Sequence, residues 1–90
     1  MRGEKMTDYE DLQVYGRVGL NEREMITVKK MKADTYEYFD IRKFIKSDSP
    51  EGYTGPTKKG ITIPVKNLEA VKNLRDALNK LIETTEKHDE

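Results

Sequence analysis

The first two thirds of the chain alternate between apolar and polar residues, with the period of two that is typical of β-strands. Residues 11–21 alternate around the glycines of "YGRVG", which predicts a bent strand with a bulge. Residues 24–31 are rich in β-branched side chains and predict a second strand. Two further strands are predicted over residues 35–44 and 59–65, with a long Ser-, Pro- and Gly-rich turn over 46–56 between them.

The third predicted strand has two chemically different faces. Alternation places Phe39 and Ile41 on one face, which we expect to be buried. The other face is expected to be open, and it carries two phenols, a carboxylate and a guanidinium, those of Tyr36, Tyr38, Asp40 and Arg42. This is an unusual set of side chains for a surface that only meets solvent.

From about Lys66 the period of the apolar residues changes from that of a strand to that of a helix. Asn67 is a candidate N-cap for a helix of about five turns, and a cap one or two residues earlier is the alternative. One stripe of this helix is apolar and is assigned to a core or a dimer interface, through Leu68, Val71, Leu74, Leu78 and Leu81. The predicted fold is therefore α+β, a four-stranded antiparallel sheet followed by one C-terminal amphipathic helix that covers one face of the sheet.

Length and composition favour one small domain that associates with a second copy. Of the 90 residues only 34% are hydrophobic, 38% are charged, and none is Trp. Such a chain buries a thin core by itself, so we expect a homodimer. We assign residues 1–10 to a flexible lead-in, 11–85 to the folded domain and 86–90 to a flexible tail.

The sequence offers little for membranes, metals or catalysis. No apolar run is long enough for a signal peptide or a bilayer span, so we expect a cytoplasmic protein, or a nuclear one if the source is eukaryotic. There is no Cys, and the single histidine, His88, lies in the predicted tail. Neither a nucleophile motif nor a phosphate-binding loop is present, because Gly60 opens a strand where a Walker A motif needs a helix. We therefore expect no enzyme, no metal and no cofactor.

The net charge is zero, but the charge is unevenly distributed along the chain. Residues 29–59 carry eight basic and five acidic side chains, whereas the segments on either side are slightly acidic. A local basic patch attracts polyanions even when the whole protein is neutral.

An open sheet face with aromatic and basic side chains is suited to single-stranded nucleic acid, whose bases stack on aromatic rings while its phosphates meet cations. The candidates for stacking are Tyr36 and Tyr38. The candidates for phosphate contact are Lys29, Lys30, Lys32, Arg42, Lys58 and Lys59. Each also has a structural interpretation: tyrosines pair well across strands, lysines protect sheet edges, and Arg42 can pair with Asp40.

Four motifs occur in an order that resembles the DNA-binding domain of the transcriptional coactivator family of positive cofactor four. They are "FDIRKF" at 39–44, "PEG" at 50–52, "KKGITI" at 58–63 and the amphipathic helix at 66–83. The resemblance covers about residues 12–83 and implies a curved four-stranded sheet backed by a helix. It also implies a homodimer whose two open channels bind single-stranded or melted DNA with little sequence preference.

The resemblance also assigns roles to individual positions. Arg42 matches the arginine of the strand motif, and Lys58 and Lys59 match the basic pair before a glycine, Gly60, which lets a backbone approach closely. Three departures concern positions where the family has an aromatic or a lysine. These are Met31 in place of the turn aromatic, Phe44 followed by Ile45 near the strand motif, and Gly55 in place of a lysine. Tyrosines, among them Tyr53, can replace the lost stacking partners.

These observations predict a non-enzymatic, homodimeric single-stranded DNA-binding protein that acts in transcription, replication or repair. Two alternatives stay open. One is a protein–protein adaptor of the transcription machinery, and the other is an RNA-binding regulator on the same fold.

Overall fold

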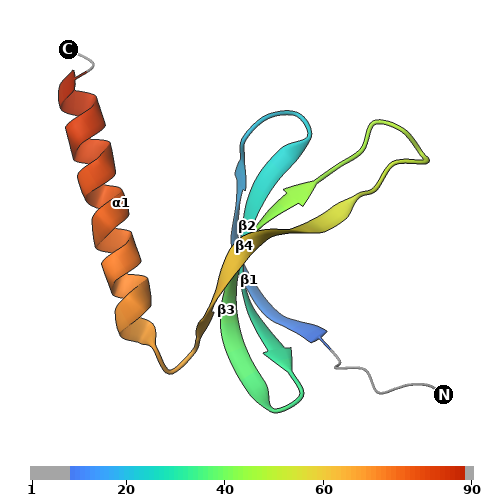
Figure 1. Cartoon of the computed structure of the whole chain (residues 1–90), viewed down its shortest axis with the longest axis horizontal. Coiled ribbons are helices and arrows are strands. Elements are labelled where there is room, and N and C mark those ends of the chain that lie inside the picture. The colour runs from blue at the N-terminus through green and yellow to red at the C-terminus, as the bar shows by residue number, and fades with distance from the viewer. Residues whose placement is uncertain (1–8, 89–90) are drawn as a thin grey trace.

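The computed structural model describes residues 9–88, which form four strands and one helix (Figure 1). In chain order these are β1 (Tyr9–Gly19), β2 (Glu24–Ala33), β3 (Tyr36–Ile45), β4 (Gly55–Pro64) and α1 (Leu68–His88). The strands form one sheet in the order β1-β2-β3-β4, and each pair of neighbours is antiparallel. The predicted α+β fold is confirmed.

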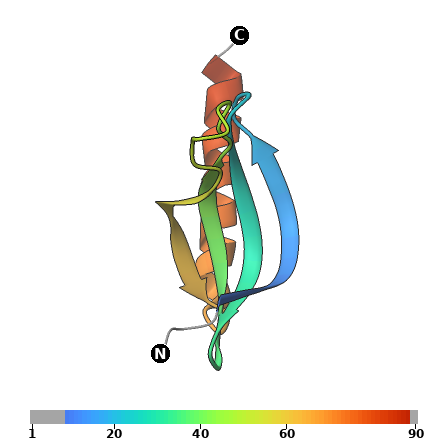
Figure 2. The same ribbon diagram turned by 90° about the vertical axis from the view of Figure 1, so that its right-hand side faces the viewer.

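The register of the sheet is regular at its centre and interrupted toward its edges. β2 and β3 pair without a shift from Glu24 opposite Ile45 to Ala33 opposite Tyr36. The pairing of β1 with β2 shifts twice, the second time just before Gly16, where the sequence predicts a bulge. The pairing of β3 with β4 shifts once, just after Arg42. Bulges of this kind bend strands and increase their twist, and the sheet is visibly curved (Figure 2).

The boundaries of the outer elements differ from those predicted. Tyr9 and Glu10 were expected in the lead-in, but they belong to β1, because β2 is long enough to pair with them. The helix begins after Asn67, whose side chain accepts a hydrogen bond from the backbone N–H of Ala70 at 3.3 Å, so the predicted N-cap is confirmed. The helix continues through residues 86–88, which were expected in the tail. Residues 1–8 and 89–90 of the predicted lead-in and tail lie outside the described part of the chain.

The helix does not cover a face of its own sheet, and this prediction is wrong for a single chain. Among the described elements α1 contacts only β4, and it stands beside the sheet (Figures 1 and 2). The chain reverses after β4 through a turn in which the N–H of Asn67 donates to the carbonyl of Pro64 at 2.9 Å. The apolar stripe is therefore left exposed, to 59% at Leu81.

The described chain has almost no core of its own. No side chain is fully buried, and the described residues that count as buried are Thr27, Tyr38, Asp40 and Gly55. The radius of gyration is 16.4 Å, whereas a compact domain of this length has about 12 Å. On the sheet face that carries Phe39, Ile61 is 50% exposed. Within residues 9–88, both this face and the helix stripe lack an apolar partner.

Candidate nucleic-acid interface

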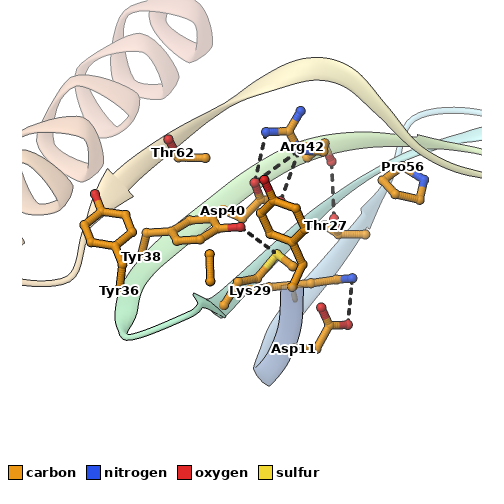
Figure 3. A pocket seen from close by; sticks show the side chains of 12 residues that line it. Asp11, Thr27, Lys29, Tyr36, Tyr38, Asp40, Arg42, Pro56 and Thr62 are labelled. Carbon is orange, nitrogen blue, oxygen red and sulfur yellow. Dashed lines mark hydrogen bonds and ion pairs between the residues drawn. The ribbon is translucent and has the colours of Figure 1, made fainter. Parts of the chain in front are cut away.

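One face of the sheet encloses a hollow of about 760 Å³ (Figure 3). We call this face the concave face and the opposite one, which carries Phe39 and Ile41, the convex face. All four strands contribute to the lining, which consists of Tyr9, Asp11, Thr27, Lys29, Met31, Ala33, Tyr36, Tyr38, Asp40, Arg42, Pro56 and Thr62.

The pairing of β2 with β3 explains why these residue types meet. Thr27 lies opposite Arg42, Lys29 opposite Asp40, and Met31 opposite Tyr38, and with a period of two all six side chains point to the same side. The prediction that Tyr36, Tyr38, Asp40 and Arg42 share a face is thus confirmed. In the described part of the chain no helix covers this face, but the curved sheet leaves only 8% of Tyr38 and 4% of Asp40 exposed, so parts of the face are buried.

Tyr36 and Tyr38 form a stacked pair at one end of the hollow. Their ring centroids are 5.7 Å apart and their planes differ by 24°. Tyr38 is 8% exposed and its hydroxyl donates to the sulfur of Met31 at 3.9 Å, whereas Tyr36 is 49% exposed. Burial, with the nearby Asp40 carboxylate, raises the pKa of the Tyr38 phenol above its ordinary value, so this phenol stays uncharged at physiological pH. The exposed ring of Tyr36 is accessible to a ligand, and the buried ring of Tyr38 packs against the ring of Tyr36.

The side chain of Arg42 is held in place by two partners within the sheet, Asp40 and Thr57. Its Nε and Nη2 donate to Asp40 Oδ1 at 3.1 and 3.0 Å, and its Nη1 donates to the carbonyl of Thr57 at 2.8 Å. Pairing with Asp40 was the structural interpretation of Arg42, and it is confirmed. The guanidinium is thereby fixed on the wall of the hollow, with its orientation set by β3 and β4.

The three lysines of β2 are divided between the two faces. Lys29 lines the hollow and pairs with Asp11 at 3.0 Å. Lys30 pairs with Glu37 at 3.6 Å, and alternation places it, with Lys32, on the convex face. The structure therefore does not bring Lys30 and Lys32 together with the stacked tyrosines.

Lys58 and Lys59 lie in the irregular part of β4, where three residues face one residue of β3. The hydroxyl of Thr57 fixes this segment, because it donates to the carbonyl of Lys43 at 2.9 Å and accepts from the N–H of Lys59 at 3.1 Å. Both lysine side chains are exposed. Within the described part of the chain no carboxylate forms an ion pair with either of them.

Lys59 also borders a smaller groove of about 330 Å³ on the convex face, beside Ile26, Ile41 and Ile61. Glu24 is near this groove and pairs with Lys43 at 2.9 Å. Hydrogen bonds from Lys43 and Asn21 lower the pKa of the Glu24 carboxyl, and the charge of Lys59 adds to the effect. The Glu24 carboxylate is therefore stabilised in its charged form beside the groove.

Gly60 has a structural reason to be glycine. It lies opposite Arg42, and a Cβ atom here would be 2.7 Å from the carbonyl oxygen of Ile41 and 2.8 Å from the Cα of Arg42. Those distances are far below a van der Waals contact with backbone atoms. The close approach that glycine permits is thus one between β3 and β4, and a contact of Gly60 with nucleic acid stays a prediction.

Sequence reasoning missed the contribution of the first strand to the hollow. Tyr9 and Asp11 lie across β2 from the third strand, next to Ala33 and Met31. Asp11 was placed in the first predicted strand but without a role in the site, and Tyr9 falls where a flexible lead-in was expected. Tyr53, a suggested stacking residue, is elsewhere: its hydroxyl donates to the carbonyl of Pro56 at 2.5 Å in the long turn.

Other kinds of site find no support in residues 9–88. No group of three or more potential metal ligands occurs there, and no helix is long and apolar enough to cross a membrane. The hollow contains an aromatic pair, fixed cations and carboxylates, which together can bind flat rings with polar edges.

Comparison with known proteins identifies the family. The profile described as Transcriptional Coactivator p15 (PC4) matches residues 18–74, which include β2, β3, β4 and the first turns of α1. Searches of curated proteins and of solved structures find no match. Because the profile covers more than half of the sequence, and includes the stacked tyrosines, Arg42 and the lysine pair, the chain belongs to the transcriptional coactivator p15 (PC4) family.

Proposed function

We propose that this protein is a non-enzymatic homodimer that binds single-stranded DNA and regulates transcription, or acts in replication and repair. The observation that carries the proposal is the stacked pair of Tyr36 and Tyr38 in a hollow of a sheet, in a chain of a DNA-binding coactivator family. Unpaired bases expose π-faces that duplex DNA hides, so such a platform favours single strands.

The proposed binding mode separates bases from phosphates. Bases stack on the exposed ring of Tyr36, which contributes roughly 1–3 kcal/mol per base. Phosphates bind the exposed side chains of Lys58 and Lys59 at the edge of the sheet. Neither contact reads a base edge, so this mode has little sequence preference.

The lack of a core in one chain supports the proposed homodimer. The helix stripe and the convex face are both apolar and exposed, and a second copy provides two further surfaces of the same kind. A closed two-fold interface buries the same patches on both chains. Such a dimer presents two hollows to one strand or to two.

A fluorescence titration with labelled oligo-dT at several salt concentrations tests this function. Affinity should fall with salt, by a log–log slope of about 0.7 for each phosphate bound. Failure to bind at low salt would contradict the proposal, as would equal affinity for duplex DNA. Competition between DNA and RNA oligomers of the same sequence separates the proposal from an RNA-binding regulator.

Replacing Lys58 and Lys59 together by alanine should weaken binding and make it less dependent on salt. If each lysine neutralises one phosphate, the slope falls by about 1.4. Lys72 and Lys80 are exposed lysines on the helix and provide the matched control, since their double replacement removes the same charge. Thermal melting of both variants should match that of the wild type. An unchanged slope would remove the lysine pair from the site.

Replacing Tyr36 by alanine should lower the affinity for oligo-dT by about 5- to 150-fold, which corresponds to one lost stacking contact. The salt slope should stay the same, because the phosphate contacts are kept. Tyr36→Phe keeps the ring and should bind like the wild type. Equal affinities for the alanine and phenylalanine variants would show that bases do not stack here.

The groove beside Lys59 on the convex face favours a second candidate function, that of an adaptor. It is lined by Leu20, Ile26 and Ile61 between lysines, so it fits an apolar segment with acidic flanks from the transcription machinery. A partner that stays bound after nuclease treatment and in high salt would support this function.

A further inference from the structure

The charges that line the hollow cancel one another. Its two cations are Lys29 and Arg42 and its two anions are Asp11 and Asp40. Each cation touches its own anion, with Nζ–Oδ2 of Lys29 and Asp11 at 3.0 Å and Nη2–Oδ1 of Arg42 and Asp40 at 3.0 Å. The charges of Lys29 and Arg42 are therefore largely neutralised by their carboxylate partners, and neither cation is free to bind a phosphate. Among the described residues Lys58 and Lys59 form no such ion pair.

Solvent exposure supports this interpretation. The side chains of Lys29 and Arg42 are 18% and 22% exposed, and that of Asp40 is 6% exposed. A phosphate entering the hollow would have to approach two carboxylates and displace existing ion pairs. A neutral base meets neither obstacle, and it finds the tyrosine pair there.

Asp11 differs from Asp40 because it is half-exposed and, among the described residues, keeps one oxygen available. Its Oδ2 accepts from Lys29, and within the described residues no donor reaches its Oδ1. In the sheet Asp11 lies beside Met31, and Met31 lies beside Tyr38. With strands about 4.8 Å apart, Asp11 and Tyr38 are separated by about 10 Å across Met31. A base that stacks on the tyrosines with its edge toward β1 therefore meets the Asp11 carboxylate.

We propose that the hollow holds a base and excludes phosphate, and that Asp11 makes it prefer a base with an exocyclic amino group. The proposal rests on the single-strand binding proposed above and adds a preference at one base position in each hollow. A carboxylate only accepts hydrogen bonds. It therefore accepts a hydrogen bond from the amino group of cytosine. Uracil and thymine carry a carbonyl at the same ring position, and this second acceptor is repelled by the carboxylate.

Two pyrimidine oligomers of equal length, oligo-dC and oligo-dU, test the preference at mildly alkaline pH, where cytosine is unprotonated. Their bases are alike in size and differ at the edge that meets Asp11. The wild-type protein should bind oligo-dC about fivefold more tightly, the effect of one hydrogen bond kept or lost. Asp11→Asn should abolish or reverse the preference, because an amide can donate to uracil as well as accept from cytosine.

Glu10→Gln is the matched control, since it removes the same charge from the neighbouring residue, which alternation places on the other face. It should keep the preference for oligo-dC. Two results would overturn the role of Asp11 and leave the proposed function intact. One is equal affinity of the wild type for the two oligomers, and the other is an unchanged preference in Asp11→Asn. Failure to bind either oligomer would overturn both proposals.

Discussion

Replacing Leu78 and Leu81 by glutamate is expected to turn the protein into monomers that no longer unfold cooperatively. Both side chains are at least half exposed in a single chain, so their apolar surface is available to a partner. Full burial of a leucine contributes about 1.5–3 kcal/mol, and a dimer would bury four. The loss of roughly 6–12 kcal/mol exceeds what a small domain without a core can tolerate.

Light scattering gives the mass in solution, and a thermal melt followed by circular dichroism gives the cooperativity. Asn73 and Asn79 lie on the polar side of the same helix, so Asn73→Glu with Asn79→Glu adds equal charge without touching the stripe. This control should remain dimeric with an unchanged melting temperature. A leucine variant that keeps the mass of a dimer would show that the stripe is not the interface.

Gly60→Ala is expected to destabilise the protein by about 3 kcal/mol, at the upper end of the range for added methyl groups in tight sites. The new Cβ would meet backbone atoms of Ile41 and Arg42 at less than 3.0 Å. Backbone cannot rotate aside as a side chain can, so β3 and β4 must separate locally. Arg42 would then lose the position from which it bonds Thr57, and binding to oligo-dT should weaken as well.

Gly16→Ala is the control for this substitution, because a Cβ at Gly16 meets nothing within 4 Å. Its stability in urea should equal or slightly exceed that of the wild type, since alanine restricts the unfolded chain more than glycine does. A Gly60→Ala protein with normal stability but weakened binding would reverse the assignment. It would show that Gly60 faces the nucleic acid and not the neighbouring strand.

Much of the sheet was predictable because each strand carries its own two-residue period. The face of β3 that holds Tyr36 and Arg42 followed from that alternation, and the helix followed from its leucines and from Asn67. The ends were less predictable. Tyr9 joins β1 because a partner strand extends that far, and no local pattern contains this information.

Which residues line the hollow depends on the register in which the strands pair, and the sequence does not determine that register. Alternation separates Lys29 from Lys30 and Lys32, but only the pairing of Lys29 with Asp40 tells which group joins the tyrosines. Asp11 on β1 and Tyr38 on β3 line the same hollow with only β2 between them. The two residues are far apart in the sequence, so no local pattern predicts that they meet. At Gly60 the sequence suggested a different cause. Its position next to the lysines suggested that glycine is needed for contact with a ligand, whereas the structure shows that a side chain here would clash with the backbone of β3.

The position of the helix beside the sheet links folding to the amount of protein that is made. If only another copy covers the leucine stripe, folding and pairing are one reaction, and the free energy of unfolding increases with total concentration. The folded fraction then rises more steeply than expression does. A cell that makes little of this chain would hold mostly unpaired copies exposed to proteases, and a modest rise in synthesis would switch on the binding activity.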